Sequence, residues 1–278
     1  MGRAKDIVVK PIDSKSANTF VRHHHYSGKV VNNSQLHLGA FLDDKLHGVM
    51  QFGPSLDKSK IIGLVEGTGW NEFIELNRLA FDDSLPKNSE SRCISVAMRL
   101  IRKYCPHVKW VISFADGAQC GDGTIYRASG FVLTGIKRNT SIWEAPDGGD
   151  NAAIGATVNR IGGQEALRRA RFSRTSLTDG KSKAEQAKAM AVLRDTRTTA
   201  TKGKYTSGAN GGASMKPFIE AGFRPLPGYQ LRYLYFLDPT ARERLTVPIL
   251  PFSEIEKRGA KMYKGQRIIR EVETPTKC

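Results

Sequence analysis

Apolar and polar positions follow two different periods along the first half of the chain, and each period predicts its own elements. Ile7 to Ile12 is a short β-branched run, which predicts an opening strand. The next stretch begins with a helix cap at Ser14 or Ser16 and ends near Gly28. It carries apolar side chains at helical spacing, at Ala17, Phe20 and Val21. A strand followed by an amphipathic helix is therefore expected at the start.

The middle of the chain predicts a hairpin, two central strands and one long helix. His37 to Phe52 alternates between apolar and polar residues around a turn at Asp43–Lys45, which is typical of a hairpin. Phe73–Phe81 and Lys109–Asp116 are apolar on both faces, as buried strands are. Between them, Ser89 to Tyr104 is the clearest helix, with one face formed by Ile94, Ala97, Met98 and Ile101.

Shorter elements follow the second central strand. A glycine-rich turn leads into a short helix over Thr124–Ser129, which Gly130 should end. Phe131–Ile136 and Ser141–Glu144 are expected to form a further pair of strands, and Tyr229–Asp238 a late strand of the same sheet. The order of the elements resembles that of the N-acetyltransferase fold of the GNAT type. We therefore predict an α+β protein, a GNAT-like mixed sheet flanked by helices.

Between these elements the regular pattern lapses over residues 146–215, which are rich in Gly, Ala, Ser, Thr, Lys and Arg. Helix-forming stretches occur there at Gln164–Phe172 and Lys183–Arg194. The predicted organisation is a core over residues 1–145, a basic insertion over 146–215, and a last part, 216–278. That last part adds the final core strand and a basic tail.

The positive charge of the chain is concentrated in one segment. The net charge is +16, and residues 151–228 alone carry 14 basic and 5 acidic groups. A localised positive surface favours a polyanion partner, because phosphate contacts release counterions. The alternative is a solvated basic face without a partner. If the partner is double-stranded DNA, the candidate contacts are Arg168, Arg169, Arg171 and Arg174 in the insertion, and Lys257, Arg258, Lys261, Lys264 and Arg267 in the tail.

Composition narrows the cellular setting. No apolar run approaches the roughly 18 residues that cross a bilayer, and residues 1–10 lack the apolar core of a signal peptide. The four cysteines show no regular spacing, which favours reduced thiols over disulfides or a zinc site. We expect a cytoplasmic protein without a membrane partner. The sequence leaves open whether it forms a homodimer.

The loop before the long helix is a candidate anion site. In GNAT enzymes a helix at this place binds the pyrophosphate of acetyl-CoA with its first N–H groups and the positive end of its dipole. Here Ser89 and Ser91 lie at the helix start, and Lys87 and Arg92 would add positive charge. The loop lacks the glycine-rich pattern usual in that family. Simple capping of the helix by a serine explains the two hydroxyls equally well.

Four short motifs sharpen the comparison with known families. They are HHYSG at 24–28, ELNRL at 75–79, SFAD at 113–116 and GTIYRA at 123–128. In combination and spacing they resemble the Mom family of phage DNA-modification proteins. The resemblance covers most of residues 20–145 and the late strand at 229–238.

The resemblance implies a specific activity. Mom-family proteins are described as GNAT-like enzymes that convert adenine in DNA to an N6-carbamoylmethyl form, which masks the base from host restriction nucleases. Acetyl-CoA is the suggested donor, and iron has been implicated. Since an amino group inside a duplex is out of reach of an enzyme, the base would have to be flipped out of the stack.

The matched positions are His25, Tyr26, Arg78, Asp116 and Tyr126, together with Ser91 at the helix start. Asp116 ends a buried strand, where it would accept a hydrogen bond from the adenine amino group or act as general base; a turn aspartate is the alternative. Tyr126 would donate a proton on the donor side, or pack its ring in the core. Arg78 needs an anionic partner or a structural ion pair. His25 is the candidate iron ligand, beside Tyr26.

Two other functions remain open at this stage. One is an ordinary acetyltransferase acting on an amine or peptide, which would transfer acetyl groups without DNA. The other is a non-catalytic basic DNA-binding or anti-restriction protein, whose DNA binding would survive loss of Asp116 and Tyr126. Adenine modification in duplex DNA is the function that the sequence favours.

Overall fold

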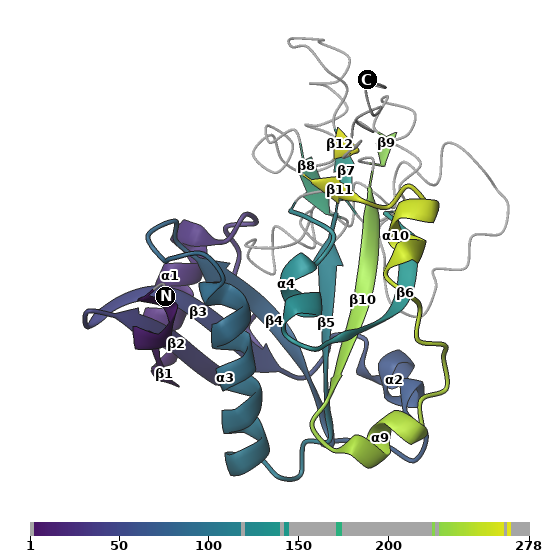
Figure 1. Ribbon diagram of the computed structural model, residues 1–278, viewed down its shortest axis with the longest axis horizontal. Coiled ribbons are helices and arrows are strands. Elements are labelled where there is room, and N and C mark those ends of the chain that lie inside the picture. The colour runs from purple at the N-terminus through teal and green to yellow at the C-terminus, as the bar shows by residue number, and fades with distance from the viewer. Residues whose placement is uncertain are drawn as a thin grey trace, which may run out of the picture. The chain divides into compact units, whose positions relative to one another are not determined.

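A mixed seven-stranded sheet forms the centre of the computed structural model (Figure 1). The structure describes residues 3–117, 120–139 and 228–261, and the backbone of strands at 142–144, 171–173, 224–225, 262–263 and 266–267. The chain divides into two compact units, 1–137 with 228–278, and 138–227, which are described separately. The sheet belongs to the first unit. Its order is β1 (Val8–Pro11), β2 (Leu36–Leu42), β3 (Lys45–Gly53), β4 (Phe73–Phe81), β5 (Trp110–Asp116), β10 (Tyr229–Phe236) and β6 (Val132–Arg138).

Helices flank this sheet, so the predicted α+β class is confirmed. The elements are η1 (Arg3–Asp6), α1 (Ser14–His24), α2 (Lys58–Ile61), η2 (Ile62–Leu64), α3 (Ser89–Tyr104), α4 (Thr124–Ala128), α9 (Pro239–Glu243) and α10 (Ser253–Lys257). Helix α3 has the predicted bounds. The cap of α1 is not a serine but Asp13, whose carboxylate accepts from the Ser16 N–H at 2.9 Å. An ionised acceptor at this position also suits the positive end of the helix dipole.

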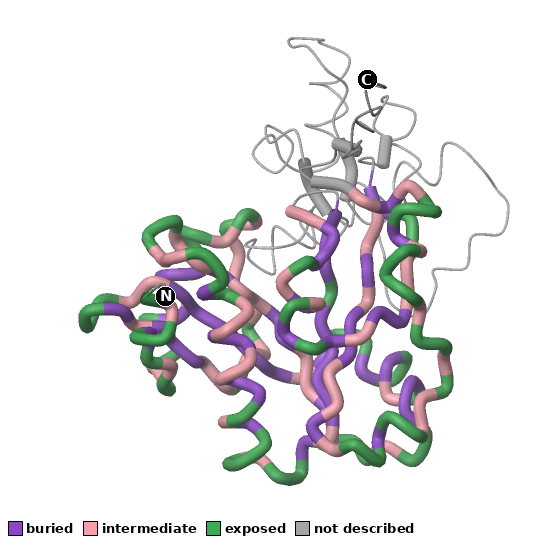
Figure 2. Tube along the Cα trace, viewed as in Figure 1, coloured by how far each residue is buried: buried purple, intermediate pink, exposed green. Residues whose placement is uncertain are grey.

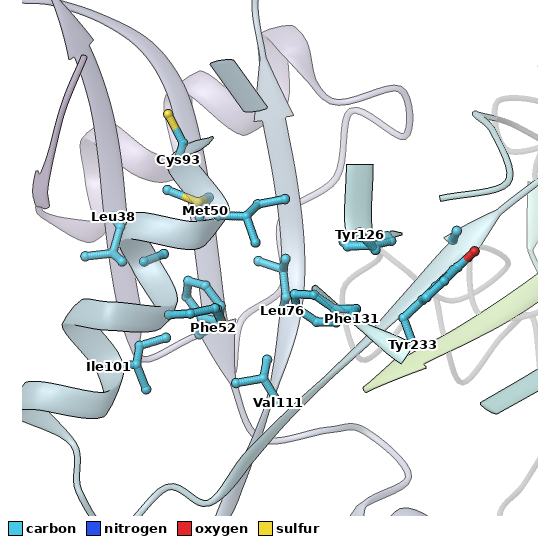
Figure 3. Close-up of a cluster of buried hydrophobic side chains, with 14 of the residues drawn as sticks. Leu38, Met50, Phe52, Leu76, Cys93, Ile101, Val111, Tyr126, Phe131 and Tyr233 are labelled. Atoms are coloured by element: carbon cyan, nitrogen blue, oxygen red, sulfur yellow. The ribbon is translucent and has the colours of Figure 1, made fainter. Parts of the chain in front are cut away.

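The two faces of the sheet bury different clusters. Helix α3 packs the predicted face, Ile94, Ala97, Met98 and Ile101, into one cluster with side chains such as Met50, Phe52 and Val111 (Figure 3). On the other face, α1 covers Val49 and Ala80. Residues of α2 and η2 cover Trp110 and Ile112 there. Figure 2 shows the buried positions concentrated along the central strands. Strands β4, β5 and β10 therefore lie between two apolar layers, which explains their apolar sequences.

The pairing of the later strands differs from the prediction in one respect. β6 and β7 (Ile142–Glu144) do not pair with each other: β6 borders β10, whereas β7 pairs with β8 (Arg171–Ser173) and β9 (Arg224–Pro225) in the second unit. The late strand β10 lies between β5 and β6, where it buries Leu231, Tyr233 and Leu234. A two-residue strand pair, β11 (Met262–Tyr263) and β12 (Gln266–Arg267), lies near the C-terminus.

Part of the predicted insertion can be compared with the structure. The helix expected over Gln164–Phe172 does not reach its predicted end, since Arg171 and Phe172 are in β8. Its remainder, and the helix expected over Lys183–Arg194, lie outside the described residues. The domain boundaries at 145 and 215 stay predictions.

Strands β4 and β5 pair for only a short distance. They are parallel over three residue pairs, from Phe73–Trp110 to Glu75–Ile112. Beyond that point β5 continues beside β10 as far as Asp116, while β4 stays beside β3 and carries an extra residue, Asn77, opposite the Gln51–Phe52 step. The carboxyl-terminal halves of β4 and β5 are thus unpaired with each other. Within the described part of the chain, no helix is long and apolar enough to cross a membrane.

Candidate active site

Residues from four separate elements meet where β4 and β5 part. His25 and Tyr26 directly follow α1, Arg78 lies on β4, Asp116 ends β5, and Tyr126 is on α4. Their mutual electrostatic effects link them: Arg78 acts on His25, and Asp116, Arg78 and Tyr126 all act on Tyr26. The structure therefore brings together five positions that the motifs contributed from distant parts of the sequence.

Arg78 holds the loop after α1 against the sheet. Its Nε donates to the carbonyl of Lys29 at 2.8 Å, and its Nη1 donates to the carbonyl of Asn77 at 2.7 Å. Two backbone carbonyls thus orient the guanidinium, and its charge is also felt by the carboxyl of Glu75, two residues before the bulge. Arg78 is consequently a fixed positive charge in the middle of the site.

His25 is a neutral imidazole. Its Nδ1 accepts from the backbone N–H of Ser27 at 3.2 Å and lies 2.8 Å from the Ser27 hydroxyl, so its proton belongs on Nε2. Its ring lies 4.2 Å from that of Tyr26, centroid to centroid. Burial, reinforced by the cation of Arg78, lowers the pKa of His25 to about 3. The imidazole does not protonate at physiological pH.

Among the described residues, the predicted iron ligand His25 is not accompanied by a set of His, Cys, Asp and Glu ligands. Nδ1 of His25 is already engaged with Ser27, and the described residues contain no group of three His, Cys, Asp or Glu side chains that could hold a metal ion. Because iron sites in proteins need several such ligands, the described residues do not fit an iron centre at His25. We derive no step through a metal.

Tyr26 connects the two sides of the site. It is 52 % exposed, yet protein atoms crowd its hydroxyl, and burial raises its pKa. Cys120 and Asp116 raise the pKa further, whereas Arg78 opposes the change. Tyr26 therefore stays a neutral phenol with an accessible ring. Cys120, whose Sγ donates to the Asp116 carbonyl at 3.1 Å, is a site neighbour that no sequence pattern indicated.

The ring of Tyr126 is held in place by tight packing against neighbouring aromatic rings. Gly123, at φ +80°, begins α4, and a Cβ there would lie 2.5 Å from the ring of Tyr233. The ring of Tyr126 packs against Tyr233 and Phe131, at centroid distances of 5.3 and 5.5 Å (Figure 3). The ring of Tyr126 therefore packs in the core, as the structural alternative for this residue predicted.

The hydroxyl of Tyr126 is buried beside that of Ser113. Burial raises its pKa to about 12, so it is a proton donor at neutral pH. The nearby hydroxyl of Ser113 lowers the pKa, although this buried hydroxyl makes no hydrogen bond of normal geometry. Asp116, by contrast, lies on the opposite face of β5 from Ser113, because side chains alternate along a strand. Asp116 and Tyr126 both act electrostatically on Tyr26 and raise its pKa.

Glu75 is a second titratable group beside the site. Burial raises its pKa, and hydrogen bonds from Ser55 and Asn77 and the charge of Arg78 oppose that rise. In the sequence, Glu75 stood out only as the first residue of the ELNRL motif. Its burial follows from the α2 side of the sheet, which the sequence did not reveal.

The predicted phosphate-binding side chains are mostly committed elsewhere. The hydroxyls of Ser89 and Ser91 donate to the carbonyls of Pro86 and Asn88, and neither caps α3. Arg92 donates to the carbonyls of Ala4 and Lys5, which ties η1 to α3. The N-cap is Asn88, at φ +69° and without a side-chain cap, and Lys87 is exposed. The Ser89 N–H donates to the Pro86 carbonyl at 3.2 Å, so an anion would use the following N–H groups of the first turn of α3 rather than these hydroxyls.

Little of the predicted DNA-binding set can be placed. Arg168, Arg169, Arg174 and Lys264 lie outside the described residues, and Arg171 is known only as a backbone position of β8. Lys261 is paired with Glu256 at 2.9 Å. Lys261 therefore stabilises the end of α10, a role that its place in a basic tail did not suggest.

Known proteins resemble this chain in sequence and in fold. The model of the Mom protein family matches residues 6–188. Methylcarbamoylase mom of Escherichia phage Mu is 42 % identical over 138 residues, which is 49 % of this chain and 57 % of that relative. The match thus spans little more than half of the phage Mu protein.

Solved acetyltransferases are similar to part of this chain, at low sequence identity. An IAA acetyltransferase from Bacillus cereus is 12 % identical with a TM-score of 0.35, covering 48 % of this chain and 82 % of its own. A Bacillus subtilis acetyltransferase in complex with CoA is 13 % identical with a TM-score of 0.34, covering 48 % and 80 %. The element order and the parting of β4 and β5 are those of a GNAT-like fold.

The family model covers well over half of the chain, and it includes all four motifs that converge at the parting of β4 and β5. This chain belongs to the Mom protein family.

Proposed function

We propose that this protein is a transferase that modifies adenine in double-stranded DNA to an N6-carbamoylmethyl-type base, with acetyl-CoA as donor, and so shields phage DNA from restriction. The observation that carries the proposal is the convergence of His25, Tyr26, Arg78, Asp116 and Tyr126 at one point of the sheet. Membership of the Mom family and the methylcarbamoylase named in phage Mu support the same chemistry.

The side chains suit attack by an amino nitrogen. When N6 of adenine forms its new bond to carbon, it must lose one proton, and a carboxylate at Asp116 is a suitable acceptor. Arg78 offers a fixed positive charge for the carbonyl oxygen of the transferred two-carbon unit. Tyr26 and Tyr126 have raised pKa values, so both are protonated donors at neutral pH.

Acetyl-CoA would supply the two-carbon unit, with CoA as the leaving group. Joining its methyl carbon to N6 removes two hydrogens and therefore requires an external two-electron oxidant, and an ammonia-level nitrogen donor replaces CoA to form the terminal amide. The start of α3 fits its phosphates through backbone N–H groups, because Asn88 leaves the helix without a side-chain cap. Lys87 adds an exposed positive charge beside this helix end. The side chains of Ser89, Ser91 and Arg92 would support the loop rather than bind the cofactor.

Duplex DNA as substrate is supported by the charge of the chain. A net charge of +16 provides the sequence-independent attraction that phosphates require. We assign the DNA contact to the basic insertion over residues 146–215. The target base would be extruded from the duplex when this contact forms. Extrusion costs a few kcal/mol, which phosphate contacts would offset.

Nucleoside mass spectrometry tests the proposal. DNA from cells that express the chain is digested and compared with DNA from cells that express Asp116→Asn. A deoxyadenosine carrying a carbamoylmethyl group in the first sample alone is the expected result. An N-acetyl product, or acetylated amines without DNA, would instead support the ordinary acetyltransferase. Unmodified DNA that is nonetheless bound would support the non-catalytic alternative.

A further inference from the structure

One aromatic side chain of the central sheet is left exposed next to the candidate site. Trp110, Ile112, Phe114 and Asp116 share a face of β5, because side chains alternate along a strand. Trp110 and Ile112 are fully buried under the α2 and η2 cluster, whereas Phe114, the next on this face, is 42 % exposed. The apolar cover of the face is thus interrupted at Phe114, whereas Asp116, two residues further along, is only 8 % exposed.

The neighbouring strand places a carboxamide opposite Asp116. β10 pairs with β5 so that Arg232 faces Phe114 and Gln230 faces Asp116. The Gly117 N–H donates to the Tyr229 carbonyl at 2.8 Å, which makes these two pairs the non-hydrogen-bonded kind. In such pairs the Cα atoms are about 4.5 Å apart and the side chains lie close together on one face. Gln230 and Asp116 therefore project side by side.

Arg232 is anchored away from the ring. Its Nε donates to the Thr134 hydroxyl at 3.1 Å and its Nη2 to the Thr134 carbonyl at 2.9 Å. The guanidinium also lies next to Gly135 of β6. The guanidinium thus lies toward β6. It contributes positive charge near the exposed ring of Phe114 without covering that ring.

We propose that Phe114, Gln230 and Asp116 form the subsite that receives the extruded adenine, an inference that rests on the proposed function. The purine ring stacks on Phe114. The Gln230 carboxamide makes paired hydrogen bonds to the amino group and a ring nitrogen of adenine, as Gln does in other complexes. Asp116 accepts the second amino hydrogen, which places N6 beside the proton acceptor.

The chemistry of this face selects a purine with an amino group over other occupants. A protein helix would need a continuous apolar surface, whereas here a single ring is bordered by Asp116, Gln230 and Arg232. A carboxylate that accepts from an amino group repels the carbonyl oxygen that guanine and thymine carry in the corresponding place. The positive charge of the chain matches the phosphates on either side of the base.

Binding to short labelled single strands tests the subsite independently of catalysis. The full chain is titrated with strands of deoxyadenosine or of thymidine, at raised salt so that phosphate contacts count less. We expect tighter binding of the adenine strand by the parent. Phe114→Ala should weaken binding of both strands about 5- to 150-fold, because stacking tolerates any base. Phe114→Tyr should restore it.

Gln230→Leu separates recognition from stacking. It should remove the preference for adenine while binding of thymidine stays at the parent level. Tyr104→Ala, which removes an exposed ring on α3, is the matched control and should bind as the parent does. If Phe114→Ala unfolds, Phe114→Leu replaces it, since leucine keeps apolar volume but lacks a ring to stack on.

The outcomes distinguish the subsite from the proposed function. Unchanged binding of both strands by Phe114→Leu and Gln230→Leu would overturn the subsite, even if the parent modifies DNA. If the parent modifies no DNA but shows adenine preference that depends on Gln230, the subsite stands and the proposed reaction fails. In an active parent, both variants should also raise KM more than they lower kcat.

Discussion

Arg78 and His25 lie close enough for the guanidinium on β4 to oppose protonation of the imidazole that follows α1. Burial is the larger cause, and together the two effects lower the pKa of His25 to about 3. The hydrogen bond from Arg78 to the Lys29 carbonyl, at 2.8 Å, holds this arrangement in place. A neutral histidine beside a fixed cation is thus built into the site.

This relationship predicts how stability depends on pH. The unfolded chain takes up a proton on His25 near pH 6.5, but the folded chain does so only near pH 3. Between these values the unfolded state binds more protons, so stability falls as the pH falls. His25→Gln should flatten this part of the curve, measured by urea unfolding between pH 7 and 4. His24→Gln, at an exposed position of α1, is the control; an equal loss in parent and His25→Gln would contradict the assignment.

Asp116→Asn and Tyr126→Phe test the chemistry. Both are nearly isosteric, so fold and DNA affinity should persist, while the modification rate falls about 10²–10⁴-fold, as is usual on loss of a general acid or base. Tyr126→Ala should instead cost about 3–5 kcal/mol of unfolding free energy, because the ring packs on Phe131 and Tyr233. A near-parent rate in either conservative variant would exclude that residue from catalysis.

Gly123→Ala should destabilise the protein by about 2–5 kcal/mol, since it combines a left-handed backbone with overpacking. The position has φ +80°, and the new Cβ would lie 2.5 Å from the Tyr233 ring. Gly63→Ala is the matched control, because no atom lies within 4 Å of its Cβ position. The measurement is the midpoint and slope of urea unfolding. Equal midpoints for the two variants would show that the contact can relax.

CoA binding should depend on Lys87 and not on the two serines. Ser91→Ala removes only a hydroxyl that donates to the Asn88 carbonyl, so its affinity should match the parent. Lys87→Ala should weaken binding several-fold by removing a charge near the helix start. Calorimetric titration of each variant with CoA gives the comparison. An absence of parent binding at millimolar CoA would reject the proposed donor site.

Charge reversal of Arg168, Arg169 and Arg171 should weaken binding to DNA of any sequence and flatten its salt dependence. Reversal of Lys15, Lys45 and Arg99, which are exposed on the sheet unit, changes the net charge equally and serves as control. Duplex affinity is measured over a series of salt concentrations. If both triple variants lose the same affinity and salt dependence, the net charge of the chain determines DNA binding and the basic insertion is not the DNA contact.

The sequence by itself determined the local elements. The apolar repeat of α3 and the apolar run of β4 predicted their bounds, because helical and extended periods differ. The hairpin turn was also readable, since Asp43 and Asp44 adopt φ values of 50° and 59° that aspartate tolerates. The four motifs likewise indicated the family before any geometry was known.

Only the tertiary structure decided which of these elements meet. The sequence does not reveal that β10 enters between β5 and β6, because strand pairing joins residues over a hundred positions apart, as Gln230 and Asp116 show. Nor does it show that Arg92 ties η1 to α3, or that Lys261 pairs with Glu256. The sequence shows that a side chain is charged but does not identify its partner, because the partner is set by the packing of distant segments. The burial that keeps His25 neutral arises only when distant apolar segments assemble around it.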